Sequence, residues 1–370
     1  MIVTKTYPLQ SISMEEAKKL QFWIVDCITN EFQGHEILSR GDLGVVLGLN
    51  QPLTTQKAER VIRKIFGAEE SLLVRGAGSA AIRFGLHAML KPGETVLVHK
   101  APVYETTETS FRMMGLHKIE ADFNDLAQLC RTLGEHPEIR GVVIQHTRQL
   151  PEDCYELSVV IQTIKKLRDI PILVDDNYAA LKIPRIGSQY GADLSCFSSF
   201  KLLGPEGIGI IVGKKKYLDL LKEEHYSGGM QTQGHEAMDV LHGLVYAPVA
   251  LAIEAQESEL CVQRLKAGEI PEVKDAFLAN AQSKVILVEL KEEIAEKVLR
   301  ESEKLGAAPY PIGCESKYEM VPLFYRISGT FRKVDPFLEH RMIRINPLRA
   351  GSDTVIRILK ESIERVKVCL

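Results

Sequence analysis

One lysine, Lys201, stands where a surface charge is unexpected. The apolar and hydroxyl-rich run 194–200 precedes it, and the segment 204–209 after it holds three glycines and a proline. A lysine amine becomes a nucleophile when it is partly desolvated, and it can hold a carbonyl cofactor as a Schiff base. If Lys201 holds a phosphorylated aromatic aldehyde, other segments must supply an anion-binding loop, a carboxylate for the ring nitrogen and a flat side chain against the ring.

The anion-binding loop is expected in the segment 76–81, which reads Gly-Ala-Gly-Ser-Ala-Ala. It follows the short apolar run 71–74 and opens a helical stretch, so backbone amides and the helix dipole there would attract an anion. The same spacing is typical of a dinucleotide-binding turn, which needs an acidic residue at the end of the next strand. That strand ends in Val98-His99-Lys100. A dinucleotide site is therefore disfavoured, and a purely structural turn remains an alternative.

Two carboxylates, Asp175 and Asp176, follow the apolar run 172–174. A carboxylate at this place can bind a metal, cap a helix or pair with a buried cation. A metal is the weaker choice, because no histidine cluster at ligand spacing completes a site. We expect Asp175, the first acidic residue after the strand, to keep the ring nitrogen protonated, and Asp176 to be structural.

Two further segments offer polar and aromatic partners. Tyr104 follows the apolar run 95–98 and can stack on a cofactor ring, although a loop tyrosine is as often a half-buried aromatic. The hydroxyl of Ser198, three residues before Lys201, is a suitable donor for a phosphate ester. Each feature is modest alone, and only their shared position after apolar runs favours a single site.

Short apolar runs alternate with helical stretches through the middle of the chain, which predicts an α/β fold with a mainly parallel sheet and helices on both faces. The predicted strands are 95–98, 141–145, 171–174, 194–197 and 208–212, and helices are expected at 124–133 and 157–167. Ligands bind at the carboxyl ends of such strands. The loops that should open onto one crevice begin at Gly76, Ala101, His146, Asp175 and Ser198.

A long helical segment, 235–265, leads to a second set of elements. Its predicted strands are 284–290, 320–328 and 342–346, and its charged helices are 291–305 and 352–368. We therefore predict an N-terminal segment of residues 1–48 that joins the small domain, a large domain of residues 49–255 and a small C-terminal domain of residues 256–370.

The bulk composition excludes several partners. The chain has 370 residues, 45% of them hydrophobic and 26% charged, and a formal net charge of −3. This composition argues against nucleic acid and anionic membranes as ligands, because binding to them rests on clustered Lys and Arg. The seven cysteines are scattered without a Cys-x-x-Cys pair, which predicts reduced thiols in a cytoplasmic protein. No apolar run approaches the roughly 20 residues that cross a bilayer.

Several segments resemble fold-type I pyridoxal phosphate enzymes of the aspartate aminotransferase superfamily. Residues 192–213 resemble the cofactor-lysine region of bacterial selenocysteine synthases. Segments similar to the cysteine and methionine metabolism enzymes are 78–82, 90–93 and 104–107. Residues 174–179 resemble the aspartate loop of the superfamily, and 342–347 are similar to the small-domain strand of class V aminotransferases.

The resemblance implies a seven-stranded-type sheet in a pyridoxal phosphate-binding large domain, a small α+β domain made from both chain ends, and a homodimer with sites near the interface. It implies that Lys201 forms the Schiff base, Asp175 binds the pyridine nitrogen and Tyr104 stacks on the ring. The phosphate would be held by Gly78, Ser79, Ala80 and Ser198. Arg344 would bind the substrate carboxylate through its planar fork.

Two weaker assignments come from the same resemblance. His146 is similar to a site-facing histidine of related enzymes, where it would contact the ring or act as an acid or base near neutral pH; it can equally be a loop histidine. Thr232, in a loop that resembles the interface loop of class V enzymes, would lend a phosphate contact to the neighbouring subunit.

The chain also departs from these families. Selenocysteine synthases act on a charged transfer RNA, whereas this chain has a net negative charge and lacks a basic N-terminal domain. Glu105 and Thr106 replace the paired glycines of the cysteine and methionine enzymes. We therefore expect a small amino acid as substrate, with transamination as the reaction and β- or γ-elimination of a cysteine- or methionine-type amino acid as the alternative. A non-catalytic cofactor-binding protein and a nicotinamide-dependent dehydrogenase are less favoured.

Overall fold

A computed structural model describes residues 5–148, 150–281, 283–313 and 315–368, which form two compact units. The large unit comprises Glu15–His146 and Cys154–Pro248. The small unit comprises Met1–Met14, Thr147–Asp153 and Val249–Leu370.

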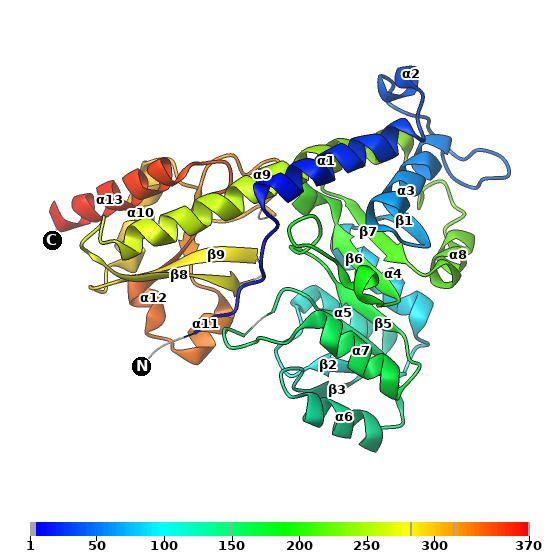
Figure 1. The fold of residues 1–370 in the computed structure, drawn as a ribbon, viewed down its shortest axis with the longest axis horizontal. Coiled ribbons are helices and arrows are strands. Elements are labelled where there is room, and N and C mark those ends of the chain that lie inside the picture. The colour runs from blue at the N-terminus through cyan, green and yellow to red at the C-terminus, as the bar shows by residue number, and fades with distance from the viewer. Residues whose placement is uncertain (1–4, 149, 282, 314, 369–370) are drawn as a thin grey trace. The chain divides into compact units, whose positions relative to one another are not determined.

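The large unit contains a seven-stranded sheet in the order β1-β7-β6-β5-β4-β2-β3 (Figure 1). The strand β7 is antiparallel to both of its neighbours, and the other pairs are parallel. The predicted α/β fold with a mainly parallel sheet is confirmed. The strands are β1 (Glu70–Arg75), β2 (Thr95–His99), β3 (His117–Ala121), β4 (Ile139–Gln145), β5 (Ile172–Asp175), β6 (Leu194–Ser198) and β7 (Ile208–Gly213).

Successive residues of a strand point to opposite faces of the sheet. In this sheet both sets are apolar, so helices cover both faces. In β5, Leu173 packs in the cluster with α4, α5 and α8, whereas Ile172 and Val174 pack in the cluster with α6 and α7. The helices of the large unit are α1 (Met14–Thr29), α2 (Gly34–Ile37), α3 (Leu53–Phe66), α4 (Ala77–Met89), α5 (Glu105–Met114), α6 (Leu126–Glu135), α7 (Leu157–Leu167) and α8 (Lys215–Glu224). Two short 3-10 helices are η1 (Gly187–Tyr190) and η2 (Ser199–Leu202).

The N-terminal segment divides between the units, unlike the single segment predicted for residues 1–48. Residues 15–48 pack with the large unit, where Glu31 accepts hydrogen bonds from Arg60 Nε (2.8 Å) and Lys64 Nζ (2.6 Å) of α3. Asp42 caps the same helix, because its carboxylate accepts from the first-turn amide of Leu53 at 2.6 Å. The preceding residues belong to the small unit.

The helix α9 (Gly234–Lys266) begins in the large unit and continues into the small unit, with Pro248 at the division. By length and composition it could cross a membrane, with an 18-residue window of mean hydropathy 1.3. More than half of that window, 56%, is buried inside the protein, which is usual for a core helix.

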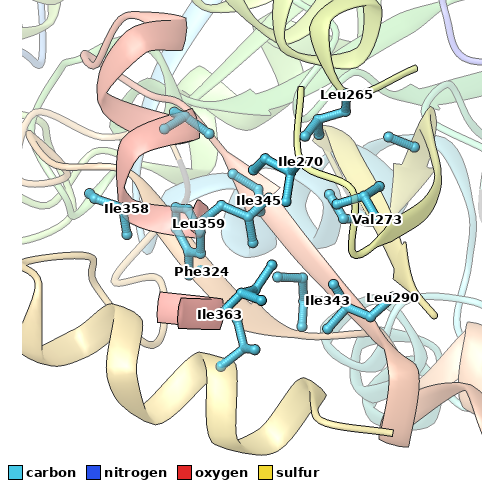
Figure 2. Close-up of a cluster of buried hydrophobic side chains, with 14 of the residues drawn as sticks. Leu265, Ile270, Val273, Leu290, Phe324, Ile343, Ile345, Ile358, Leu359 and Ile363 are labelled. Atoms are coloured by element: carbon cyan, nitrogen blue, oxygen red, sulfur yellow. The ribbon is translucent and has the colours of Figure 1, made fainter. Parts of the chain in front are cut away.

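The small unit contains a four-stranded antiparallel sheet in the order β10-β11-β9-β8. Figure 2 shows the apolar cluster on one face, where Ile343 and Ile345 of β11 meet Leu359 and Ile363 of α13. The alternate residue Met342 packs on the opposite face. The elements are β8 (Val273–Ala281), β9 (Ser283–Leu290), α10 (Ala295–Lys304), β10 (Leu323–Arg326), α11 (Gly329–Val334), α12 (Leu338–Arg341), β11 (Met342–Asn346) and α13 (Ser352–Val368).

Candidate active site

The chemistry-bearing residues of the large unit gather at the carboxyl ends of its parallel strands. Asp175 is the last residue of β5, and Lys201 lies in η2 directly after β6. Because β5 and β6 are parallel neighbours, their ends place both residues at the same edge of the sheet. Lys201 is half-buried and Asp175 is buried, so water only partly screens the two charges.

Asn177 joins this pair. Its Oδ1 accepts hydrogen bonds from Lys201 Nζ at 3.2 Å and from the backbone amide of Ser198 at 3.0 Å. Its Nδ2 donates to Asp175 Oδ1 at 2.7 Å, and its backbone amide donates to the same oxygen at 3.0 Å. The lysine, the carboxylate and the turn after β6 are thus held by one side chain.

Burial raises the pKa of Asp175 above its ordinary value, and the adjacent charge of Asp176 adds to the rise. The hydrogen bonds from Asn177 and the charge of Lys201 act in the opposite direction. A buried carboxylate of this kind is stabilised as an ion by a bound cation. A protonated ring nitrogen provides such a cation.

The anion-binding loop lies beside the same asparagine. Gly76 precedes α4 without a side-chain cap, and first-turn amides of a helix, here including Gly78 and Ser79, have no acceptor within the helix. A Cβ at Gly78 would lie 2.7 Å from Asn177 Oδ1, so only glycine permits this approach. Ser79 Oγ contacts Thr106 Oγ1 of α5 at 2.9 Å. The amides and hydroxyls of the loop therefore have the chemistry that a phosphate group requires.

The other predicted contacts of this site also follow strand ends. Ala80 is buried in the first turn of α4, where its amide donates to Gly76. Ser198 is buried at the start of η2, with its Oγ accepting from the amide of Phe200 at 3.3 Å. Tyr104 is 38% exposed and directly precedes α5.

His146 follows β4 and forms a buried pair with Asp176. His146 Nδ1 lies 2.6 Å from Asp176 Oδ1, and the second carboxylate oxygen accepts from the amide of Gly187 at 3.0 Å. The backbone amide of His146 donates to the carbonyl of Asp175. A carboxylate on Nδ1 fixes the ring orientation and favours a proton on that nitrogen, as in other histidine acid–base pairs.

Backbone strain is concentrated in these turns. The non-glycine residues Ala77, Tyr178, Leu181 and Leu203 have φ values between 57° and 64°. Left-handed backbone at non-glycine residues is costly and is retained where the surrounding structure fixes it, often at functional sites. The Tyr178 ring covers the amine of Lys201, with 4.3 Å between Nζ and the ring centroid.

Two further predicted site residues come from other segments. Thr232 is completely buried in its own chain, and its carbonyl accepts from Thr55 Oγ1 at 2.7 Å. Its phosphate contact to a neighbouring subunit stays a prediction. Arg344 belongs to the small unit, where Nε donates to the carbonyl of Arg326 at 2.6 Å and the guanidinium lies 4.0 Å from the Tyr325 ring centroid.

Sequence reasoning missed Asn177 and Tyr178 and treated Asp176 as structural only. The available signal was the spacing Asp175-x-Asn177, because an aspartate two residues before an asparagine is typical of a side-chain-stabilised turn. The partner of Asp176 is 30 residues away in the chain. No local pattern reports such a contact.

Comparisons with known proteins support one family. The model of the class V aminotransferase family matches residues 48–243, and that of the YhfS-like C-terminal domain matches residues 259–359. YhfS of Escherichia coli is 51% identical over 362 residues, which are 98% of this chain and 100% of YhfS. The solved structure of YhfS, described as pyridoxal-5'-phosphate dependent, matches with a TM-score of 0.96.

More distant relatives match in part. An L-seryl-tRNA(Sec) selenium transferase of Clostridium botulinum is 25% identical over 194 residues, covering 47% of this chain and 41% of that protein. A cystathionine gamma lyase of Micromonospora echinospora, 16% identical, covers 86% of this chain and 88% of the lyase with a TM-score of 0.68, which shows the fold alone. The chain belongs to the class V aminotransferase family of fold-type I pyridoxal phosphate-dependent enzymes.

Proposed function

We propose that this protein transfers the amino group of a small amino acid, with pyridoxal phosphate held by Lys201. The observation that carries the proposal is the half-buried Lys201 beside the buried carboxylate of Asp175, both next to the glycine loop of α4. The match to the class V aminotransferase family supports amino-group transfer. When bound, pyridoxal phosphate supplies an electron-withdrawing ring that stabilises negative charge at the substrate α-carbon.

Lys201 is the proton carrier in this proposal. After an incoming amine replaces it, the neutral Nζ can accept the α-proton of the substrate and return a proton to a neighbouring carbon. Asn177 Oδ1 and the face of Tyr178 hold Nζ at 3.2 Å and 4.3 Å. Both are electron-rich groups that stabilise the ammonium formed by this transfer.

The remaining residues bind and orient. Asp175 would accept a hydrogen bond from the protonated ring nitrogen. Gly78 and Ser79 would hold the phosphate through their first-turn amides and Ser198 through its hydroxyl, whereas the amide of Ala80 already donates to Gly76 within α4. Tyr104 would cover the ring. Arg344 already uses Nε within its own chain, so it would bind a substrate carboxylate through its terminal nitrogens.

Elimination is the second candidate, and the His146–Asp176 pair favours it. Loss of a group from the β or γ carbon needs an acid to protonate the leaving atom in addition to the lysine base. A buried histidine oriented by a carboxylate can serve as that acid. Transamination requires only one proton carrier. A variant without His146 should therefore still catalyse transamination, whereas elimination would lose its acid.

We also propose a cytoplasmic homodimer. Large apolar side chains are exposed along residues 22–53 of the large unit, with Leu38 at 89% exposed and Leu47 fully exposed. Exposed apolar surface of this extent marks an interaction site, and a second copy of the chain is the partner we propose. The buried free thiols Cys27, Cys196 and Cys261 support a reducing compartment.

The test is a single-turnover product assay. The purified protein, loaded with pyridoxal phosphate, is mixed with single L- and D-amino acids, and keto acid and ammonia are both measured. Amino-group transfer predicts one equivalent of keto acid per site without ammonia, and regeneration of the enzyme by an added keto acid. Continuous release of keto acid with ammonia would identify a lyase instead.

A further inference from the structure

Both the oxygen and the nitrogen of the Asn177 side-chain amide form hydrogen bonds at the site. Its oxygen accepts from Lys201 Nζ at 3.2 Å and from the Ser198 amide at 3.0 Å, and its nitrogen donates to Asp175 Oδ1 at 2.7 Å. The nitrogen donates to a carboxylate and the oxygen accepts from an amine, so the amide orientation is fixed by both partners. A flipped amide would oppose like groups at each end.

The same turn occurs a second time in the large unit, which shows what is special at Asn177. After β3, Asn124 donates from its backbone amide and from Nδ2 to Asp122 Oδ1, at 2.9 Å and 2.8 Å. Its oxygen accepts from two backbone amides, those of Cys154 (2.7 Å) and Tyr155 (3.0 Å). In the turn after β5, Asn177 makes the same set of hydrogen bonds, except that the Lys201 amine replaces one of the two backbone amides that donate to the side-chain oxygen.

The Asn177 amide has little freedom to move. A Cβ on Gly78 would lie 2.7 Å from Oδ1 and 2.9 Å from Nδ2, so the α4 loop packs against the amide directly. On the following residue, Tyr178, the backbone is left-handed with φ of 64°, which places the ring over Nζ of Lys201. The two adjacent residues therefore confine the amine from two directions.

We propose that Asn177 is the positioning residue of the active site, which holds the amine of Lys201 and the carboxylate of Asp175 in one fixed arrangement. This inference rests on the proposed function, because it requires that Lys201 is the Schiff-base lysine. Tyr178 assists by covering the amine with the face of its ring. Neither residue needs to react, since both act through Lys201.

The consequence concerns the proton on Lys201. Schiff base formation joins the neutral Nζ to an aldehyde carbon and releases one water, so the ammonium must first lose its proton. An amide oxygen at 3.2 Å stabilises the ammonium. Asn177→Ala removes this acceptor and Asn177→Asp replaces it with a carboxylate of the same shape. The other ionisable groups of these turns, Asp175, Asp176 and His146, stay unchanged in both variants.

The experiment measures the rate at which each apoprotein forms a Schiff base with added pyridoxal phosphate, by absorbance, across a pH series. For Asn177→Ala the midpoint of the pH profile is expected to fall by about one pH unit, the effect of losing a hydrogen bond to a charged group. For Asn177→Asp the midpoint is expected to rise. A general loss of structure would not move the midpoint of the pH profile in opposite directions in two variants of the same residue.

One control completes the design. Asn124→Ala removes the matched amide away from Lys201 and should leave the midpoint unchanged. Equal midpoints for wild type, Asn177→Ala and Asn177→Asp, or displacements in the same direction, would overturn the role of Asn177.

Failure of the proposed function has a separate signature. If Lys201→Ala still forms a Schiff base that borohydride traps at a single site, Lys201 is not the cofactor lysine and both proposals fall. If Lys201→Ala loses that Schiff base while the Asn177 variants behave as wild type, only the inference on Asn177 is overturned.

Discussion

Gly78→Ala tests the close approach between the α4 loop and Asn177. The added Cβ would lie 2.7 Å from Asn177 Oδ1, whereas ordinary contact begins at 3.4 Å. The amide must therefore retreat by about 0.7 Å, which is typical of overpacked sites that cost about 1–3 kcal/mol. A retreat of that size away from Lys201 would lengthen the contact to Nζ, now 3.2 Å, beyond hydrogen-bond range.

We expect Gly78→Ala to fold and to bind pyridoxal phosphate about 10- to 100-fold more weakly, the equivalent of that energy. The assay is an absorbance titration of the apoprotein beside a thermal melt. The matched control is Gly134→Ala, because Gly134 lies in α6 with no atom within 4 Å of an added Cβ. This control should keep the wild-type affinity and gain about 0.5–1 kcal/mol of stability. A folded Gly78→Ala protein with wild-type affinity would refute the reasoning.

Three further predictions concern pH, catalysis and assembly. Burial raises the pKa of Glu59 from 4.5 to about 7. The free energy of unfolding therefore falls as the pH rises from 4.5 to about 7, because over this range the unfolded state releases the proton that the folded state keeps. Glu59→Gln should unfold like wild type at pH 5 in urea and be more stable by up to about 3 kcal/mol at pH 8; an equal difference at both pH values would contradict this. His146→Gln should keep the cofactor and lower substrate turnover less than tenfold if the reaction is amino-group transfer, whereas a loss of turnover of about 10²–10⁴ would favour elimination. If the protein forms the proposed dimer, Leu47→Asp should convert it to a monomer in sedimentation experiments, and an unchanged dimer would exclude this segment from the interface.

The sequence predicted the large sheet well because its central strands are buried on both faces and appear as continuous apolar runs. The edge strand β3 was not predicted, since His117-Lys-Ile-Glu-Ala121 is polar and largely exposed. The strand β8 was missed for a similar reason, because it carries Lys274, Asp275 and Asn280. Polar residues in an edge strand remove the apolar pattern from which a strand is predicted.

A site residue could be predicted only where a side chain suited to the chemistry, or a glycine loop, directly follows a predicted strand. Lys201, Asp175 and the glycine loop satisfy that condition, and the structure brings them together through Asn177. The His146–Asp176 pair depends on two strand ends meeting, which no local pattern contains. The burial of Thr232 likewise follows from tertiary packing and not from its own segment.

The central claim is that Lys201 carries pyridoxal phosphate as a Schiff base. The most direct measurement is borohydride reduction of the loaded protein, followed by digestion and mass spectrometry of the modified peptide. We predict one reduced pyridoxyl group per chain, attached to Lys201, and no specific label in Lys201→Ala. A label on another lysine, or an equal label in Lys201→Ala, would contradict the account.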